Sequence, residues 1–233
     1  MPFLAGYHAV HEALRSRPHE VVRVLVGPRA ATKRRSSIAE LCERRGVALE
    51  NVDNAALDRL GVPNHQGFAS EVKARTEAPR RSDDELVVLV EDVQDPRNLG
   101  ALLRVCEGAG VGSVLIRDRG SAPLGPTVAK TSSGALEWLD VERVTNSAQA
   151  IERLKKEGYW VYGATSDGVP PWELELTGKV ALCIGGEEGG LRARTRGLCD
   201  ALVGLPMRGR VESLNLATAA AALLYEAVRQ RES

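Results

Sequence analysis

The chain lacks the features that mark membrane, secreted and metal-binding proteins. No apolar stretch in its 233 residues approaches the roughly 18 residues that a membrane-spanning helix needs. The first residues, MPFLAGYHAVHEALRS, have neither the basic start nor the long apolar core of a signal peptide. The four cysteines lie far apart without a C-x-x-C pair, which argues against a zinc site or a disulfide framework. We therefore expect a soluble, cytoplasmic protein that holds no metal and contacts no membrane.

Histidine is absent from the second part of the chain. All four histidines lie within the first 65 residues. A catalytic Ser-His-Asp or Cys-His arrangement and a histidine-ligated metal are therefore excluded from any domain that lies wholly downstream. There is also no G-x-x-x-x-G-K-[ST] phosphate loop. The sequence GAGVG at 108–112 follows a predicted helix and precedes a strand, which is the reverse of the order in a dinucleotide-binding motif.

The chain has no net charge, but its charges are unevenly distributed. With 31 Lys and Arg against 31 Asp and Glu, the total alone argues against a nucleic-acid partner. Residues 1–82 nevertheless carry a balance of +5, and residues 83–233 a balance of −5. This asymmetry is a hint of a nucleic-acid-facing N-terminal part. The polar stretch KARTEAPRRSDDE at 73–85 separates the two parts, so we predict domains at 1–75 and 86–233, joined by a linker at 76–85.

Apolar runs alternate with helical patterns in both parts of the chain. Before the linker we expect strands at 21–26, 47–52 and 67–72, with helices at 32–45 and 54–60. After it we expect strands at 86–92, 113–117, 141–144, 159–164, 180–184 and 201–205. Helices are expected at about 98–109, with Asn98 as the cap, and at 148–157 and 213–230. This order predicts an α/β protein whose larger domain has a mostly parallel sheet.

Three segments contain residues that could bind a ligand or take part in catalysis. Each follows a predicted strand, at the strand end where open α/β sheets bind their ligands. They are QDPRNLGALLR (94–104), IGGEEGGL (184–191) and LPMRGRVESLNLATAAAALLYE (205–226). Each has a plain structural interpretation when taken alone. Arg104 could lie on the wet face of a helix, the glycines could form a flexible turn, and Ser213 could cap a helix.

Taken together, the three segments are more specific. The patterns N-x-G-x-x-x-R, G-x-E-x-x-G-L and L-P-M-x-G-x-x-x-S-L-N-x-A resemble the motif set of the SpoU class of RNA ribose 2′-O-methyltransferases, in order and spacing, across about residues 86–230. The first 75 residues, with GYHAVHEAL and NHQG, are similar to the substrate-binding domain of one branch of that class. That branch includes the bacterial enzyme that methylates a guanosine ribose in the peptidyl-transferase loop of 23S rRNA.

The resemblance implies a fold and a cofactor. It implies an L30e-like α/β substrate-binding domain followed by an α/β-knot methyltransferase domain with a deep trefoil knot, an exception to the rule against knots. Members of the class bind S-adenosylmethionine in the knot and usually work as homodimers. By motif position, the cofactor contacts of this chain are Gly185, Gly186, Leu205, Pro206, Met207 and Leu214.

The resemblance also implies a set of catalytic residues. Arg104 would activate the ribose 2′-hydroxyl. We favour electrostatic assistance over action as a literal base, because a guanidinium group in water already holds its proton and gives it up only at very high pH. Asn98 would orient Arg104 or the ribose, while Glu187, Ser213 and Asn215 would hold the motif loops and the RNA backbone. Glu188 receives no role. In the N-terminal part, the basic run Lys33, Arg34 and Arg35 is the candidate RNA contact, although such runs are also common on solvated helix faces.

The expected function is therefore S-adenosylmethionine-dependent methylation of a ribose 2′-hydroxyl in structured RNA, with a guanosine of 23S rRNA as the leading target. Two alternatives lie in the same class: a tRNA ribose methyltransferase and an rRNA methyltransferase that confers antibiotic resistance. A third alternative, from a different class, is a non-catalytic RNA-binding or ribosome-assembly factor. Failure to bind S-adenosylmethionine would favour that third alternative.

Overall fold

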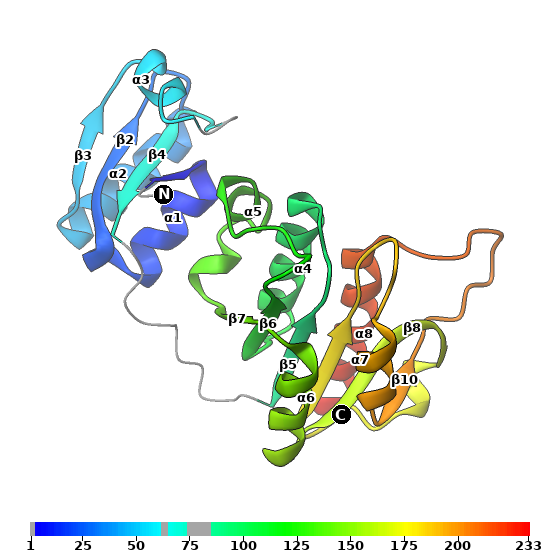
Figure 1. Cartoon of the computed structure of the whole chain (residues 1–233). Helices are drawn as coiled ribbons and strands as arrows, with labels where there is room; N and C mark the ends of the chain where they lie inside the picture. Colours follow the sequence, from blue (N-terminus) through cyan, green and yellow to red (C-terminus); the bar gives the residue numbers. More distant parts are fainter. Residues whose placement is uncertain (1–2, 62–64, 74–84) are drawn as a thin grey trace. The chain divides into compact units, whose positions relative to one another are not determined.

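The computed structural model describes residues 3–61, 65–73 and 85–233, and the chain divides into two compact units (Figure 1). The first unit holds Met1–Pro79 together with Leu124–Trp138. The second unit holds Arg80–Pro123 together with Leu139–Ser233. Of the predicted linker at 76–85, all but Glu85 lies outside the described residues.

The first unit is a four-stranded sheet with helices packed on it. The sheet order is β1-β4-β2-β3, in which β2 and β3 are parallel and β4 runs antiparallel to both β1 and β2. The elements before the linker are β1 (Phe3–Ala5), α1 (Tyr7–Ser16), the 3-10 turn η1 (Pro18–Glu20), β2 (Val21–Val26), α2 (Thr32–Arg45), β3 (Ala48–Asn51), α3 (Asn54–Asp58) and β4 (Phe68–Val72). Its core contains the fully buried side chains of Val10, Leu14, Ile38 and Phe68.

The segment Leu124–Trp138 belongs to the first unit although it lies some fifty residues beyond it in the chain. It contains α5 (Pro126–Thr131) and the 3-10 turn η2 (Ala135–Glu137), and it packs against β1 and α1 (Figure 1). Arg17 donates from Nε to Glu137 Oε2 at 2.5 Å, and the Trp138 indole donates to Glu12 Oε2 at 3.0 Å. Burial lowers the pKa of Arg17, but its hydrogen bonds to Glu137 and Glu20 outweigh that effect and raise the pKa overall. The segment is therefore anchored to α1 by nearly buried ionic contacts.

The second unit is a six-stranded sheet in the order β10-β8-β9-β5-β6-β7. Every neighbouring pair is parallel, which confirms the predicted parallel sheet. Its strands are β5 (Leu86–Val90), β6 (Ser113–Arg117), β7 (Asp140–Val144), β8 (Trp160–Val169), β9 (Val180–Ile184) and β10 (Ala201–Val203). Its helices are α4 (Pro96–Gly108), α6 (Ser147–Lys156), the 3-10 turn η3 (Pro171–Glu173), α7 (Ala193–Leu198) and α8 (Leu216–Arg231).

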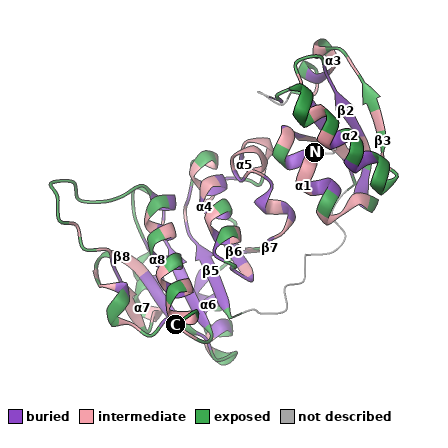
Figure 2. Ribbon diagram, turned by 180° about the vertical axis from the view of Figure 1, so that it is seen from behind, coloured by how far each residue is buried: buried purple, intermediate pink, exposed green. Residues whose placement is uncertain are grey.

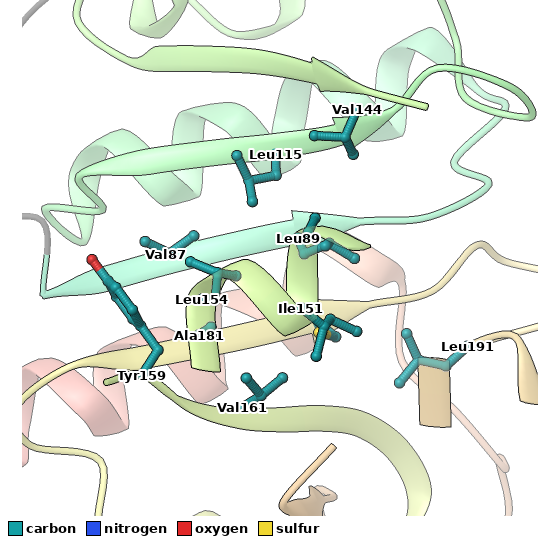
Figure 3. Packing of buried hydrophobic residues seen from close by; sticks show 12 residues of the cluster. Val87, Leu89, Leu115, Val144, Ile151, Leu154, Tyr159, Val161, Ala181 and Leu191 are labelled. Carbon is teal, nitrogen blue, oxygen red and sulfur yellow. The ribbon is translucent and has the colours of Figure 1, made fainter. Parts of the chain in front are cut away.

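Helices cover both faces of this sheet, as a buried parallel sheet requires. On one face, Ile151 and Leu154 of α6 pack against Val87 and Leu89 of the central strand β5 (Figure 3). On the other face, α4 and α8 pack against each other and over the sheet (Figure 2). Figure 2 shows the central strand β5 between these layers as buried, and every residue of β5 and of its neighbour β9 is buried. The loops at the strand ends are thus the exposed parts of this unit that can hold a ligand.

Two helices begin two or more residues away from the predicted start. Helix α4 starts at Pro96 with Asp95 as its cap, whose carboxylate accepts a backbone N–H of the first turn at 2.7 Å. Asn98 therefore lies inside the first turn, and its prediction as the cap is wrong. Helix α8 starts at Leu216 with Asn215 as its cap, so Ser213 lies outside the helix. Both differences leave a polar side chain available for other contacts.

The cysteines form no disulfide bond. All four are free, and burial raises the pKa of Cys106 to about 12 and that of Cys42 to about 11. Within the described residues, no three His, Cys, Asp or Glu side chains gather in a way that could hold a metal ion. In the same part of the chain, none of the helices has the length and apolar character needed to cross a membrane.

Candidate functional site

Three segments of the second unit meet beside the carboxyl ends of β9 and β10. The first segment is the part of strand β8 beyond Gly163, where β8 no longer pairs with β9; the second is the loop that follows β9, and the third is the loop from β10 to α8. Between them lies a cavity of about 450 Å³, within the usual size range for a small-molecule site. It is lined by Ala164, Thr165, Ser166, Ile184, Gly185, Gly186, Glu187, Gly190, Val203, Gly204, Leu205, Met207, Glu212, Ser213, Leu214, Asn215, Leu216, Ala219, Ala220 and Leu223.

The second loop passes so close to its neighbours that two of its positions require glycine. A Cβ atom on Gly185 would lie 2.0 Å from the carbonyl carbon of Gly190, and one on Gly186 would lie 2.1 Å from the carbonyl oxygen of Asp92. The loop is closed by Gly190, which donates its N–H to the Gly186 carbonyl at 3.0 Å. One edge of the cavity is therefore bare backbone, where a ligand meets peptide groups directly.

A chain of polar side chains connects the three sequence motifs. The Oδ1 atom of Asn215 caps α8 by accepting the N–H groups of Ala217 at 3.0 Å and Thr218 at 3.4 Å. This leaves its Nδ2 to donate to Asn98 Oδ1 at 3.1 Å. Asn98 in turn donates from Nδ2 to Glu187 Oε1 at 2.8 Å. Because the cap fixes the orientation of the first amide, it fixes the direction of the whole chain Asn215–Asn98–Glu187.

The structure brings most of the predicted site residues together. Eight of them line the cavity, namely Gly185, Gly186, Glu187, Leu205, Met207, Ser213, Leu214 and Asn215. Asn98 joins this group through its hydrogen bonds to Glu187 and Asn215. Pro206 is not among the lining residues, and neither is Arg104, which is exposed on α4. Lys33, Arg34 and Arg35 lie in the first turns of α2, in the first unit.

A second, more polar cavity shares a wall with the first. It has a volume of about 710 Å³, and Gly186, Glu187 and Gly190 line both cavities. Its other lining residues are Asp92, Gln94, Asp95, Asn98, Gly120, Glu188, Gly189 and Arg192. A small molecule in the first cavity and a polar partner in the second would thus be separated only by the glycine loop and the Asn98–Glu187 pair.

Asp92 lines the second cavity and forms ion pairs with two arginines. It has a left-handed backbone, with φ of 53°, directly after β5. Its carboxylate accepts hydrogen bonds from Arg117 at 2.8 Å and from Arg192 Nε at 2.7 Å. The hydrogen bond to Asp92 also raises the pKa of Arg192. These contacts tie the ends of β5 and β6 to the loop after β9.

Sequence reasoning missed several residues of the site. Thr165 and Ser166 line the cavity from β8, and Ala219, Ala220 and Leu223 line it from α8. The position of Thr165 and Ser166 just beyond a predicted strand was an available signal. The alanines of α8 carried no such signal, because small apolar residues in a helix are also typical of an ordinary core.

The sequence matches the models of two known protein families. A model of the SpoU rRNA Methylase family matches residues 85–225, which include both cavities and all three motifs. The chain belongs to the SpoU rRNA methylase family. A second model, described as RNA 2′-O ribose methyltransferase substrate binding, matches residues 3–78. The family's methylase part therefore includes Leu124–Trp138, which the structure places in the first unit.

Full-length relatives point to one branch of the family. The 23S rRNA (guanosine-2′-O-)-methyltransferase RlmB of Xanthomonas axonopodis pv. citri is 38% identical over 242 aligned positions, covering 98% of this chain and 96% of the relative. The RlmB protein of Vibrio vulnificus is 34% identical over 239 positions, covering 98% and 97%. The similarity therefore extends over both units.

Solved structures share the same fold. The crystal structure of an RNA 2′-O ribose methyltransferase matches with a TM-score of 0.82 at 30% identity, covering 99% of this chain and 89% of that chain. The SpoU methyltransferase AviRb from Streptomyces viridochromogenes matches with a TM-score of 0.81 at 26% identity and the same coverage. AviRb has also been solved in complex with the cofactor AdoMet.

Proposed function

We propose that this chain transfers the methyl group of S-adenosylmethionine to the 2′-hydroxyl of a guanosine ribose in 23S rRNA. The observation that carries the proposal is the convergence of the three family motifs on one cavity, with the Asn215–Asn98–Glu187 chain at its border. The RlmB relatives, named for this reaction, are similar to the chain over nearly its whole length. We further propose that the enzyme acts in the cytoplasm.

The first cavity fits S-adenosylmethionine in both size and chemistry. The glycine loop exposes peptide groups that can bind the polar parts of the cofactor, while Leu205, Leu214 and Leu223 provide apolar walls for its adenine ring. We propose that Gly185, Gly186, Leu205, Met207 and Leu214 hold it, with Pro206 shaping the loop between two of them. When bound, the cofactor supplies a methyl group activated by a positively charged sulfur.

The second cavity is the proposed place for the target nucleotide. Asn98 and Glu187 lie on the wall that it shares with the first cavity, so they can orient a ribose toward the cofactor. Arg104 lines neither cavity, and its proposed role comes from the motif resemblance: it would stabilise the negative charge that develops on the 2′-oxygen as the proton leaves to water. A charged guanidinium suits electrostatic assistance better than proton removal. Ser213 and Asn215 hold the third loop against this wall.

The first unit is proposed to bind the RNA backbone through the start of α2. Lys33 is exposed there. Arg34 lies over the Tyr7 ring, 5.0 Å from its centroid, and donates to Gln66 Oε1 at 3.3 Å. Arg35 donates to Asn51 Oδ1 at 2.5 Å. These contacts position the two arginines, and phosphate oxygens are their natural external partners.

The test is methyl transfer from labelled S-adenosylmethionine to unmodified 23S rRNA, 16S rRNA and tRNA, followed by mapping of the 2′-O-methyl site. We expect label on one guanosine of 23S rRNA. Label on tRNA would replace the proposal with the tRNA enzyme, and label on a 23S nucleotide other than guanosine, with drug resistance on expression, would favour a resistance enzyme. A folded protein that neither binds the cofactor nor transfers methyl would be the non-catalytic RNA-binding factor.

Asn215 provides a test that separates stability from activity. In Asn215→Ala the α8 cap is lost, and we expect the free energy of unfolding to fall by about 1–2 kcal/mol. In Asn215→Asp the capping oxygen remains, so stability should stay close to that of the wild type, but the donor to Asn98 is lost. Both variants should lose most of their methyl-transfer rate. Urea unfolding and single-turnover assays measure the two effects, and a fully active Asn215→Asp variant would remove the polar chain from the mechanism.

The homodimer and the trefoil knot remain predictions from the resemblance, and the domain limits at 75 and 86 remain predictions from the composition of the polar stretch at 73–85. A dimer is proposed because enzymes of this class usually pair through the C-terminal helix. Light scattering of the purified chain tests it directly, and a mass near 25 kDa rather than twice that value would exclude it under the conditions used.

A further inference from the structure

The first unit contains a polar cavity that the reaction described above does not use. It has a volume of about 460 Å³ and lies beyond the carboxyl ends of β2 and β3. It is lined by Arg29, Asp58, His65, Gln66 and Lys130. Two cations, one carboxylate, one imidazole and one amide thus line a common space, and they come from four separate parts of the chain.

A hydrogen bond from His65 orients the carboxylate of Asp58. His65 is only 5% exposed, and its Nδ1 atom accepts the backbone N–H of Gly67 at 3.0 Å. The imidazole proton is therefore on Nε2, which donates it to Asp58 Oδ1 at 3.0 Å. The Asp58 side chain is 58% exposed, so it keeps acceptor capacity for a second partner. A carboxylate oriented by a buried histidine is prepared to accept a hydrogen bond from outside the protein.

The conformation of the H-Q-G sequence explains why these residues lie at the cavity. Gly67 has φ of 83°, and a Cβ atom there would lie 2.4 Å from the backbone nitrogen of Ala30. This close approach brings the His65–Gly67 turn against the loop that carries Arg29. The close approach thus gives a structural reason for the H-Q-G part of the motif, since it places His65 and Gln66 at the same cavity as Arg29.

Lys130 completes the cavity from α5. Its segment is held on α1 by the Arg17–Glu137 and Trp138–Glu12 contacts, so Lys130 is a fixed part of the first unit. The cavity is therefore a composite of residues from the substrate-binding sequence match and one residue from the methylase sequence match. A lysine at this place adds a second positive charge opposite Arg29.

We propose that this cavity binds one ribose-phosphate unit of the RNA substrate and distinguishes RNA from DNA. Arg29 and Lys130 pair with the phosphate, and Asp58 accepts a hydrogen bond from the 2′-hydroxyl of the same nucleotide. The carboxylate repels the phosphates of RNA and DNA alike, but only RNA offsets this repulsion with a hydrogen bond from its 2′-hydroxyl, so Asp58 favours RNA over DNA. This inference rests on the proposed function only in taking RNA as the substrate, and it concerns a nucleotide other than the methylated one.

The test compares RNA with DNA in equilibrium binding. The full chain and its variants are titrated, by fluorescence anisotropy, into a structured 23S rRNA fragment transcribed in vitro and into DNA of the same sequence. We expect Asp58→Ala to lose about tenfold of the ratio of RNA to DNA affinity, because the hydrogen bond to the 2′-hydroxyl is lost for RNA, whereas the repulsion of phosphate is relieved for both nucleic acids. An equal change for RNA and DNA, or no change, would overturn the role of Asp58.

The cations are tested by salt dependence. Arg29→Ala and Lys130→Ala should each weaken RNA binding and together lower the slope of log affinity against log salt by about 0.7 to 1, the contribution of one phosphate contact. The matched control is Arg153→Ala, an exposed arginine on α6 of the second unit. If the cavity variants behave like the control, the phosphate site is wrong.

Two further measurements keep the result specific. Thermal unfolding of each variant shows whether the first unit is intact, and His65→Phe provides a second route to the same effect, because it removes the ring nitrogens and with them the donor that orients Asp58. We expect this variant to lose part of the preference for RNA, and an unchanged preference would contradict the proposal. Methyl transfer by the wild type is assayed separately, so a failure of the proposed function is distinguishable from a failure of this site.

Discussion

Replacing Gly185 by alanine is expected to abolish binding of S-adenosylmethionine, with a loss of at least a hundredfold in affinity. The added methyl group would lie 2.0 Å from the carbonyl carbon of Gly190, a distance that no pair of carbon atoms tolerates without bonding. The loop must therefore open, and its backbone groups leave the edge of the cavity. Since the contact is with backbone rather than with a flexible side chain, no rotamer change can relieve it.

Gly189→Ala is the matched control, in the same loop and with the same chemical change. No atom lies within 4 Å of a Cβ placed on Gly189, and its φ is not in the left-handed region. We expect its cofactor affinity to stay within about twofold of the wild-type value. Isothermal titration calorimetry gives both affinities, and circular dichroism establishes that both variants are folded. A Gly185→Ala variant that binds within threefold of wild type would show that the loop is not the cofactor edge.

Much of the fold was predictable because the signals are local. Strands β2, β6 and β9 and helix α2 begin and end at the predicted residues. Each strand is a short apolar run bounded by polar or turn residues, and α2 ends at Gly46 in the left-handed conformation, a usual helix stop. The parallel sheet followed from the alternation of strands and helices.

The helix caps show where local signals competed. Asp95 and Pro96 form the common combination of a cap followed by proline at the first helical position, and it takes precedence over Asn98 three residues later. At α8, Ser213 and Asn215 are both residue types that cap helices, and only the structure shows which one accepts the N–H groups. Because Asn98 does not cap α4, its side chain can join the polar chain Asn215–Asn98–Glu187. Asn215 caps α8, and the cap orients its amide toward Asn98. No rule of sequence spacing predicts these two roles.

Contacts between distant parts of the chain could not be predicted. The pairing of Arg17 with Glu137 joins residues that are 120 positions apart, and nothing in one sequence identifies such partners. The left-handed backbone of Asp92 had no signal either, because aspartate adopts it only when its surroundings favour it. The motif residues of the candidate site came from a resemblance, whereas the cavity and its hydrogen bonds came from the structure.

Arg104→Ala is expected to lower the rate constant for methyl transfer by about 10²- to 10³-fold, the usual effect of removing a group that stabilises developing charge. Cofactor affinity should stay within about twofold, because Arg104 does not line the first cavity. Arg153→Ala is the control, since Arg153 is an exposed arginine on α6 that pairs with Glu142. A kcat within threefold of the wild-type value would remove Arg104 from the mechanism.

The pH dependence and Arg104→Lys separate the two ways in which Arg104 could act. If it assists electrostatically, lysine keeps the charge and should retain part of the rate, although it loses the two-pronged geometry of the guanidinium. The rate of Arg104→Ala should then rise with pH, because hydroxide takes over the removal of the 2′-proton. If Arg104 were a literal base, lysine, with its lower pKa, would restore a rate that levels off as its ammonium group deprotonates. A pH profile of single-turnover rates for the three proteins decides between these mechanisms, and we expect the electrostatic one.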